Sequence, residues 1–430
     1  MSRQIDRGLR NTVDWRLVTY YLLLVFIGWI NIYASIHSSE PSSIFDWNCR
    51  SGKQFVWILS AFALAAVILF ALSPRLWEVI SGPAYFFVVV LLVAVIFVGA
   101  EVKGSHSWFR FGAVSFQPAE ISKITTSLVL ATFMGRAAFS ISNRRDFLRV
   151  ALIIGVPMLA IVAESETGSA LVYVGFLFPL FREGLSGWFL VIILLAVALF
   201  ILTLKTSVWV SLAAVGAGAL AGLWAIIRSF RPLSRERRRA LRLMAMGVAA
   251  AVLLVFSTRV VFDNVLADHQ RKRIEVLLGM KEDPSGVGYN VRQSMIAIGS
   301  GGFWGKGFLQ GTQTTYGFVP EQSTDFIFCT IGEEWGFFGC LVVIVLYGLL
   351  ITRIIQDSEK SREAFTRIYG YCLAACLFMH LFINIGMTVG LMPVIGIPLP
   401  FISYGGSSLW AFTVMLFIFI SLDRQEKKYF

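Results

Sequence analysis

Long apolar segments recur along almost the whole chain, and each is close to the length that crosses a lipid bilayer as a helix. The hydrocarbon core of a bilayer is about 30 Å thick, so a spanning helix needs about 20 mostly apolar residues. The pattern predicts single spans at residues 16–36, 54–72, 79–99, 118–138, 187–204, 207–228, 240–262, 326–352, 366–390 and 402–421.

The segment 150–181 differs, because the polar stretch 164–169 interrupts its apolar run. Arg149 precedes the segment and Arg182 follows it. Positive charges next to spans gather on the cytoplasmic side, so both arginines should lie there. We therefore expect two short spans that meet at a polar outer turn. The chain is then an all-α polytopic membrane protein with about twelve transmembrane helices.

Composition agrees with that class. Of the 430 residues, 57% are hydrophobic and 15% charged, and mean hydropathy is +0.73, which excludes a soluble domain of this size. The net charge of +11 is accounted for by basic loops at 136–149, 228–242, 353–360 and 424–428, so no nucleic-acid partner is required. We place these loops and both termini in the cytoplasm. The arginine run 235–239 is either a lipid or partner site or a topology signal, and the general charge bias favours the second interpretation.

The longest polar stretch, residues 263–325, is expected to form one large extracytoplasmic loop of a single membrane domain that covers residues 1–430. Residues 283–286 form a turn signal. In the stretch 287–298, Val287, Val291, Met295 and Ile298 share one helical face, which predicts an amphipathic helix on the membrane surface. Loops of this length usually carry function.

The end of this loop carries the strongest chemical signal, a carboxylate placed directly before an apolar span. Residues 320–325 end in Asp325, and Phe326 begins the apolar run. An acid at the edge of a membrane usually has a functional role. Apolar surroundings raise the basicity of a carboxylate, which suits a proton acceptor. We therefore expect Asp325 to be a catalytic base.

A second signal is an acid and a base inside a predicted span. Glu120 and Lys123 lie three residues apart and share a helical face, so they can pair. A purely structural pair is the alternative, but ionisable groups within spans usually mark sites, which favours a function. Trp108 and Arg110 precede this span. Trp108 is either an interfacial belt residue or a platform for a sugar, and the sequence leaves both open.

Three further polar features interrupt apolar segments. His380 and Asn384 share a face of one span, which favours hydrogen bonding between helices. The stretch 393–408 is rich in Pro, Gly and Ser, and irregular backbone at that depth must be buried in protein or line a polar cavity. Glu164 and Glu166 are either solvated turn residues or functional acids. The five cysteines show no metal-binding spacing, and no Walker, HExxH or Ser/His/Asp pattern is evident.

Several long blocks together resemble one known family. The blocks are residues 117–120, 283–302, 305–307, 311–313, 320–328 and 396–407. They are similar to the SEDS family (shape, elongation, division and sporulation), and the match runs from the first span to the last. Blocks 298–302 and 311–313 are more similar to the rod-shape members of the family than to the division members.

This resemblance implies a peptidoglycan glycosyltransferase that polymerises lipid II into glycan strands for cell elongation. It implies a multi-pass protein of the bacterial cytoplasmic (inner) membrane with its active site on the periplasmic face. The implied partners are a class B penicillin-binding protein of the PBP2 type, which is a transpeptidase, and the elongation machinery. Asp325 would be the general base of an inverting transfer.

The resemblance and the motifs also assign the substrate-binding residues, which are Glu120, Lys123, Trp108, Arg110, Lys306, Glu321, Ser403 and Ser407. Lys123, Lys306 and Arg110 are candidates to stabilise the leaving diphosphate, although for Lys306 and Arg110 a role as solvated loop charges is a strong alternative. A divalent cation, Mg²⁺ or Mn²⁺, is expected to assist, with Asp325 as a candidate ligand.

The chain departs from the family in three places. Members normally have ten spans, so we expect an inserted helix pair within 187–262. Ser107 stands where many members have Arg, and Ser323 stands where many have His, so Asp325 would act without a neighbouring His. A lipid II flippase and a non-enzymatic scaffold for the transpeptidase remain as alternatives. The concentration of polar motifs on one face favours chemistry at that surface.

Overall fold

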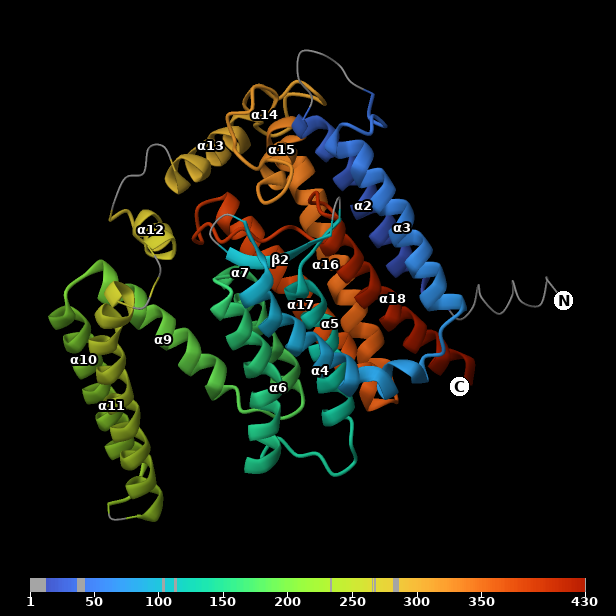
Figure 1. Ribbon diagram of the computed structural model, residues 1–430. Coiled ribbons are helices and arrows are strands. Elements are labelled where there is room, and N and C mark those ends of the chain that lie inside the picture. Colours follow the sequence, from blue (N-terminus) through green and yellow to red (C-terminus); the bar gives the residue numbers. More distant parts are fainter. Residues whose placement is uncertain are drawn as a thin grey trace. The chain divides into compact units, whose positions relative to one another are not determined.

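The computed structural model describes residues 13–36, 43–102, 105–111, 114–232, 234–264, 266, 268–280 and 286–429 (Figure 1). The chain divides into two compact units. Unit 1 comprises Met1–Leu185 together with Tyr289–Phe430, and unit 2 comprises Ser186–Gly288. Each unit is described separately below, with the helix and strand labels of Figure 1.

Unit 1 consists mainly of helices. They are α2 (Trp15–Ile36), α3 (Arg50–Phe70), α4 (Arg75–Val98), α5 (Pro118–Met134), α6 (Arg144–Ala163), α7 (Thr167–Val172), the 3₁₀ helix η1 (Tyr173–Phe176), α8 (Leu177–Arg182), α13 (Val287–Ser300), α14 (Thr312–Thr315), α15 (Ile327–Glu334), α16 (Gly336–Lys360), α17 (Ala364–Thr388) and α18 (Gly406–Tyr429). Local signals start several of them. Pro118 occupies the first turn of α5, where its missing N–H costs nothing, and the side chain of Asn143 caps α6 by accepting from the Arg145 N–H.

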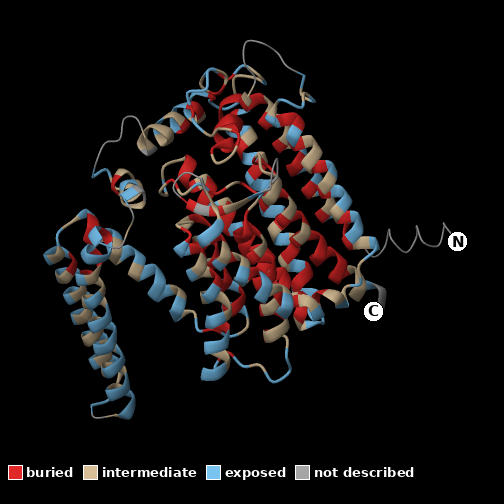
Figure 2. Cartoon of the chain, in the orientation of Figure 1, coloured by how far each residue is buried: buried red, intermediate tan, exposed pale blue. Residues whose placement is uncertain are grey.

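The centre of unit 1 is formed by α17 and α18. In their most apolar stretches 72% and 78% of residues are buried, far more than in the surrounding spans (Figure 2). Helix α17 packs against α5, α16 and α18, and α18 packs against α3. The outer helices expose large apolar side chains such as Phe86, Phe97 and Leu152, as expected where lipid replaces water.

The predicted spans are largely confirmed, but the count of twelve is not. In the described residues, ten helices are long and apolar enough to cross a membrane. Two expected spans are shorter than predicted. Helix α5 ends at Met134, and the second half of 150–181 becomes the interrupted stretch Thr167–Arg182. The predicted turn between the halves is present, and Ser165 there has a left-handed φ of +66°.

The prediction of one continuous helix over 326–352 is wrong. The helix breaks after Glu334, and Gly336, with φ +64°, starts α16 in a new direction. The loop around Gly305 fits into this break, because the N–H groups of residues 306 and 307 donate to the carbonyls of Glu333 and Glu334, both at 3.0 Å. A Cβ on Gly305 would stand 2.1 Å from the Glu334 carbonyl oxygen, so only glycine permits this approach. Hydropathy averaged over the length of a span did not detect this break, although Glu333 and Glu334 stand directly before it.

Two features refine the predicted outer loops. Between the spans predicted at 79–99 and 118–138, three short strands form a small antiparallel sheet in the order β1-β2-β3; they are β1 (Ala100–Val102), β2 (Ser105–Phe111) and β3 (Val114–Phe116). The predicted helix at 287–298 is confirmed as α13, but its buried face differs from the expected one. Ser294 and Ala297 are fully buried, whereas Met295 is 51% exposed. The Ser294 hydroxyl donates to the Thr388 carbonyl at 2.9 Å, which explains why a polar residue faces inward.

Unit 2 contains α9 (Trp188–Lys205), α10 (Val208–Ser229), α11 (Arg235–Asn264) and α12 (Asp268–Leu277). Helices α10 and α11 pack together, and α9 packs against α11. Their apolar stretches are only 6% to 11% buried, so nearly all of their surface faces outward. The three spans predicted within 187–262 are confirmed as α9, α10 and α11. That two of them form an inserted pair stays a prediction.

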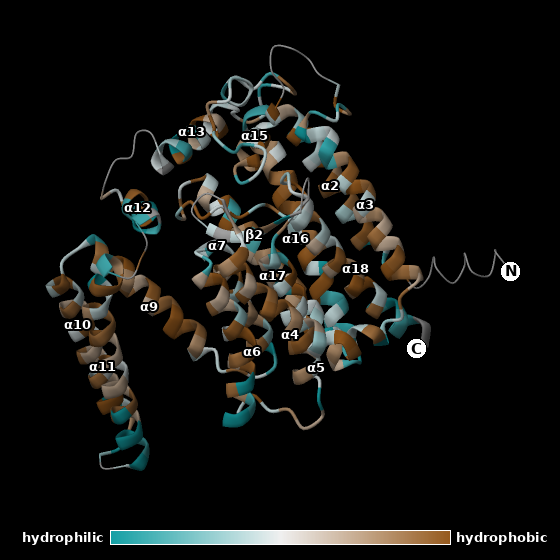
Figure 3. Ribbon diagram, viewed as in Figure 1, coloured by the Kyte–Doolittle hydropathy of each residue, from teal (hydrophilic) through white to brown (hydrophobic). Residues whose placement is uncertain are grey.

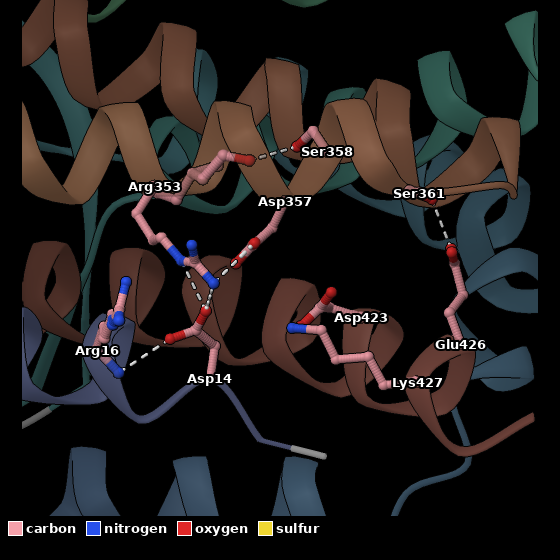
Figure 4. A network of polar contacts seen from close by, with 10 residues as sticks. Asp14, Arg16, Arg353, Asp357, Ser358, Ser361, Asp423, Glu426 and Lys427 are labelled. Atoms are coloured by element: carbon pink, nitrogen blue, oxygen red, sulfur yellow. Dashed lines mark hydrogen bonds and ion pairs between the residues drawn. The ribbon is translucent and has the colours of Figure 1, made fainter. Parts of the chain in front are cut away.

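A buried polar cluster ties the start of α2 to α16 (Figure 4). Arg353 donates from Nε to Asp14 Oδ2 at 2.7 Å, and its Nη2 lies 3.1 Å from Asp357 Oδ1. The two carboxylates are 5% and 1% exposed. Burial alone would raise the pKa of Asp14, but hydrogen bonds from Arg353, Asp357 and the Arg16 N–H hold it below its ordinary value. Arg353 is therefore the cation that makes burial of two acids tolerable.

Replacing Arg353 with Met should destabilise the protein strongly. The change keeps the bulk of the side chain but leaves Asp14 and Asp357 without their shared counter-charge. Deleting one partner of a buried ion pair costs about 3–5 kcal/mol, and we expect about 3 kcal/mol here because the Arg353 side chain is 20% exposed. Thermal unfolding in detergent measures the effect.

The matched control is Arg182→Met. Arg182 also pairs with an acid, Glu359 at 2.7 Å, but the two side chains are 43% and 41% exposed. Water screens such a pair, so the loss should stay below about 1 kcal/mol. Equal losses for the two variants would contradict the assignment of Arg353 as a buried counter-charge.

Candidate functional site

The segment that carries Asp325 is held by its backbone. Three successive carbonyls are bound by three different donors. The Tyr404 N–H donates to Ser323 O at 2.9 Å, the Ser403 hydroxyl to Thr324 O at 2.6 Å, and the Asn384 amide to Asp325 O at 2.9 Å. The segment is thus fixed to α17 and to the irregular stretch that precedes α18.

The side chains around Asp325 leave its carboxylate half-buried at the start of α15. A Cβ on Gly396 would lie 3.4 Å from Asp325 Oδ2, so the backbone at Gly396 forms one wall beside the carboxylate. Glu321, which has a left-handed φ of +55°, accepts from the Thr324 hydroxyl at 3.1 Å. Glu321 therefore shapes the turn that leads to Asp325.

Glu120 and Lys123 do pair, and a third group joins them. Lys123 Nζ lies 2.8 Å from Glu120 Oε1 and 2.9 Å from His380 Nε2, and all three side chains are buried. His380 Nδ1 lies 3.0 Å from the Pro398 carbonyl, which can only accept, so Nδ1 carries the proton and Nε2 accepts from Lys123. The ring of Phe412 lies 5.2 Å from Lys123 Nζ. Lys123 is thus surrounded by protein groups on several sides.

Helix α17 connects these two parts of the site. His380 binds Pro398 O and Lys123, and one turn later Asn384 donates both to Asp325 O and to Ile397 O, the latter at 2.7 Å. The predicted hydrogen bonding between segments by His380 and Asn384 is confirmed. One polar face of α17 therefore fixes α5, the 397–398 backbone and the Asp325 segment to each other.

The other predicted site residues differ in how far their side chains are buried and in what they bind. Trp108 is half-buried and Arg110 is exposed on β2, and Ser407 is half-buried in the first turn of α18. Ser403 is buried, and besides its bond to Thr324 it accepts from the Leu399 N–H at 2.8 Å. Ser403 is therefore part of the scaffold that holds the Asp325 segment.

Lys306 is committed to a separate ion pair. Its Nζ lies 2.7 Å from Glu333 Oε1 and 2.8 Å from the Thr312 hydroxyl. Glu333 is fully buried and also accepts from the N–H groups of Gln313 and Thr314, both at 2.9 Å. Burial opposes ionisation of Glu333, but these bonds hold its pKa below the ordinary value. Lys306 thus stabilises the loop that fits into the α15–α16 break.

Sequence reasoning missed Arg50, the first residue of α3. Its Nη1 donates to the Ser323 hydroxyl at 2.5 Å, and its guanidinium lies 5.7 Å from the centre of the Tyr404 ring. The side chain is exposed overall. A basic residue at the outer end of an apolar span was the available signal, but its partner is 273 positions away in the chain.

The described residues do not form a metal centre by themselves. Among them, no group of three or more His, Cys, Asp or Glu side chains is arranged to hold an ion. Mg²⁺ is often held by one or two carboxylates together with substrate phosphates, and Asp325 offers one carboxylate to such an arrangement. The expected cation requirement stays a prediction.

Glu164, in the turn before α7, is an unusual acid. Its side chain is buried, and both carboxyl oxygens lack a hydrogen-bond partner in the described part of the chain. The neighbouring Ser107 hydroxyl donates instead to Glu166 at 2.7 Å, and Ser105 donates to the Glu164 carbonyl at 2.7 Å. Burial, followed by repulsion from Glu166, raises the pKa of Glu164 to about 8. Glu164 is therefore mostly protonated at neutral pH.

Comparison with known proteins gives a consistent result. A family model of FtsW, RodA and SpoVE cell cycle proteins matches residues 14–220 and 238–428. Peptidoglycan glycosyltransferase MrdB of Escherichia coli K12 is 34% identical over 362 residues, covering 84% of this chain and 82% of MrdB. Peptidoglycan glycosyltransferase RodA of Treponema pallidum is 30% identical over 447 residues, covering 96% of this chain and 98% of that protein.

Solved structures show the same fold. A chain from a peptidoglycan synthase complex that coordinates polymerization and crosslinking superposes with a TM-score of 0.69 at 25% identity, covering 96% of this chain and 98% of that chain. The rod shape determining protein RodA of Thermus thermophilus gives a TM-score of 0.61 at 23% identity, covering 96% and 97%.

The protonated state of Glu164 predicts a pH-dependent stability. Between the ordinary pKa of 4.5 and the raised value of about 8, the folded chain keeps a proton that the unfolded chain has lost. Stability from this group is therefore full below pH 4.5 and is lost as pH rises toward 8, by about 1.4 kcal/mol per pH unit.

Glu164→Gln, which cannot ionise, should remove this contribution. Melting temperatures of both proteins in detergent at pH 5.5 and 7.5 measure it, and other titrating groups cancel in the comparison. The native protein should lose more stability than the variant between the two pH values. Parallel losses would show that Glu164 is ionised in the folded protein.

Proposed function

This chain belongs to the FtsW, RodA and SpoVE family of cell cycle proteins, and from that premise we propose that it polymerises lipid II with Asp325 as the general base. It is a multi-pass membrane protein and a peptidoglycan glycosyltransferase that serves cell shape and elongation. The observation that carries the assignment of Asp325 is its half-buried carboxylate on a segment whose three carbonyls are all anchored.

In the proposed reaction, the 4-hydroxyl oxygen of an acceptor GlcNAc attacks the anomeric carbon of a donor MurNAc. A new glycosidic C–O bond forms as the bond to undecaprenyl diphosphate breaks, and the hydroxyl proton passes to the Asp325 carboxylate. Direct displacement on an α-linked donor gives a β-linked product, so a single base is sufficient. The anchored backbone keeps that base in one place, which lowers the entropy cost of reaching the transition state.

The leaving diphosphate requires positive charge nearby. Arg50 is exposed and donates to Ser323, two residues before Asp325, so its guanidinium is well placed for that task. Lys306 is bound to Glu333, which favours a structural role for it. Arg110, Trp108, Glu321 and Ser407 remain proposed contacts for the sugars or the diphosphate. When bound, a divalent cation would supply further charge neutralisation.

Glu120 and Lys123 are proposed as positioning residues. Lys123 is fully buried and contacts Glu120 and His380, and α17 carries this contact on to the Asp325 segment through Asn384. Direct contact of Glu120 or Lys123 with substrate stays a prediction. With or without such contact, the buried Glu120–Lys123 pair would hold α5 in place relative to Asp325.

The cellular setting is proposed from the family and from charge bias. We place both termini in the cytoplasm and Asp325 on the periplasmic face of the inner membrane, with 263–325 as the large outer loop and an extra helix pair within 187–262 as an insertion. A class B penicillin-binding protein of the PBP2 type is the proposed partner within the elongation machinery. A related chain occurs in a synthase complex that couples polymerization to crosslinking, which supports this partnership.

Asp325→Asn should abolish polymerisation while leaving the fold intact, because the amide cannot accept the hydroxyl proton. General-base catalysis contributes about 10²- to 10⁴-fold, so glycan synthesis should fall at least about 100-fold. The assay uses purified protein with its transpeptidase partner and lipid II, with Mg²⁺, Mn²⁺ or a chelator, and reads glycan length on a gel.

Asp263→Asn is the control, since Asp263 is 53% exposed in unit 2 and should be dispensable for polymerisation. Polymer from native and Asp325→Asn protein alike would remove Asp325 from the role of base. Polymer from neither, with partner and cation present, would favour a lipid II flippase or a scaffold for the transpeptidase.

A pair of variants separates function from structure at Lys123. Lys123→Met alone leaves Glu120 buried without its cation and should cost about 3–5 kcal/mol of stability. The double variant Glu120→Gln with Lys123→Met removes both charges and should recover most of that stability. We expect polymerisation by the double variant to stay at least about ten-fold below native, because the link to His380 is lost. Full recovery of activity together with stability would make the pair purely structural.

A further inference from the structure

The turn between α10 and α11 carries a dense group of arginines that the proposed reaction does not use. Residues 228–242 contain seven arginines, one acid (Glu236) and no lysine. We call this group the arginine turn; its members are Arg228, Arg231, Arg235, Arg237, Arg238, Arg239 and Arg242. The family match omits residues 221–237, so much of this turn lies outside what the family shares.

The arginine turn lacks counter-charges within the protein. Six of its side chains are exposed and that of Arg237 is half-buried. In the described part of the chain, none of the seven forms an ion pair with a carboxylate, whereas Arg182, Arg353 and Arg367 in unit 1 all do. Charge at the turn is therefore available to an external anion.

The arginines at the start of α11 destabilise that end of the helix. Arg235, Arg238 and Arg239 are neighbours on the same side of α11 at spacings of three and four, where like charges repel. Arg235 and Arg238 also lie in its first turn, where the partial positive charge of the helix end disfavours cations. Ser234 caps this end by accepting from the Arg237 N–H at 3.1 Å, so the helix forms despite the repulsion. A bound anion would relieve it.

The turn lies at the level where a membrane meets water. Helices α10 and α11 are both long and apolar enough to span, and Figure 3 shows their hydrophobic bodies ending in a hydrophilic turn. Trp224 is 63% exposed one turn before Arg228, whose guanidinium lies 5.3 Å from the Trp224 ring. Exposed tryptophans of spanning helices gather at the headgroup level. A membrane-spanning α10 would therefore bring the arginines beyond Trp224 to the level of the headgroup phosphates.

We propose that the arginine turn binds the phosphate groups of anionic phospholipids in the leaflet that meets it. Clusters of four to eight basic residues next to a span attract anionic headgroups. A topology signal requires positive charge but does not distinguish Arg from Lys. Guanidinium groups, unlike ammonium groups, bind phosphate oxygens through two parallel N–H bonds. This explains why every basic residue of the turn is arginine and none is lysine.

The test is a lipid titration of the full chain, purified in a neutral detergent and followed by native mass spectrometry. Phosphatidylglycerol is the anionic probe and phosphatidylcholine the zwitterionic one. The native protein should bind phosphatidylglycerol more tightly than phosphatidylcholine. Equal affinity for the two lipids would overturn the proposal, and so would displacement of phosphatidylglycerol by an equal concentration of inorganic phosphate, which would indicate a free-phosphate site.

Three variants locate the binding. R237Q/R238Q/R239Q should weaken phosphatidylglycerol binding by about ten- to hundred-fold, given the attraction that each basic residue adds near an anionic surface. R144Q/R145Q/R149Q removes three arginines from another basic loop and should leave that affinity unchanged. R237K/R238K/R239K keeps charge and insertion but loses paired N–H contacts, so it should weaken binding a few-fold.

The outcomes are distinguishable. Native affinity in the glutamine variant would overturn the proposal. An equal loss in the matched control would overturn it too, by showing that any surface arginine serves. Native affinity in the lysine variant would overturn the proposed guanidinium–phosphate bonds, because positive charge alone would then explain the binding. Because the lysine variant preserves the charge bias that orients the spans, its result does not depend on membrane topology.

Discussion

Backbone carbonyls inside an apolar helix bundle have no water to satisfy them, and α17 supplies the donors on which the candidate site depends. Asn384 donates to two carbonyls from segments that are far apart in the chain, and His380 binds a third. Because α17 is among the most buried helices, these bonds are shielded from competition. This one polar face fixes the position of the Asp325 segment, the irregular stretch before α18 and the Lys123 network.

Hydropathy and spacing predicted much of this architecture. They identified most spans, the turn at 164–166, the helix at 287–298, and the residues Glu120, Lys123, His380 and Asn384 as polar groups in apolar helices. They could not identify partners, since Lys123 and His380 are 257 positions apart and Arg50 and Ser323 are 273 apart. Nor could they predict the break at Gly336, which depends on a left-handed backbone angle and on a loop fitted against it.

The two units differ in how many of their charged side chains form ion pairs. Unit 1 buries ionisable groups and neutralises several of them in pairs, as at Arg353 with Asp14 and at Lys306 with Glu333. Unit 2 pairs Arg271 with Asp263 and Glu275, but among the residues that the structure describes the arginines of its turn have no carboxylate partner. Internal pairing specifies one packed arrangement, whereas unpaired surface charge suits contact with the surroundings.

The anchoring of Ser323, Thr324 and Asp325 through main-chain oxygens has an evolutionary consequence. A hydrogen bond to a carbonyl does not depend on which side chain the residue bears, so the main-chain anchors would persist if positions 323 and 324 changed, whereas the side-chain bonds of Ser323 with Arg50 and of Thr324 with Glu321 would not. This accounts for a serine at 323 where the family resemblance leads one to expect histidine. The donors are more constrained, because replacing Asn384 would remove its bonds to the Asp325 and Ile397 carbonyls together.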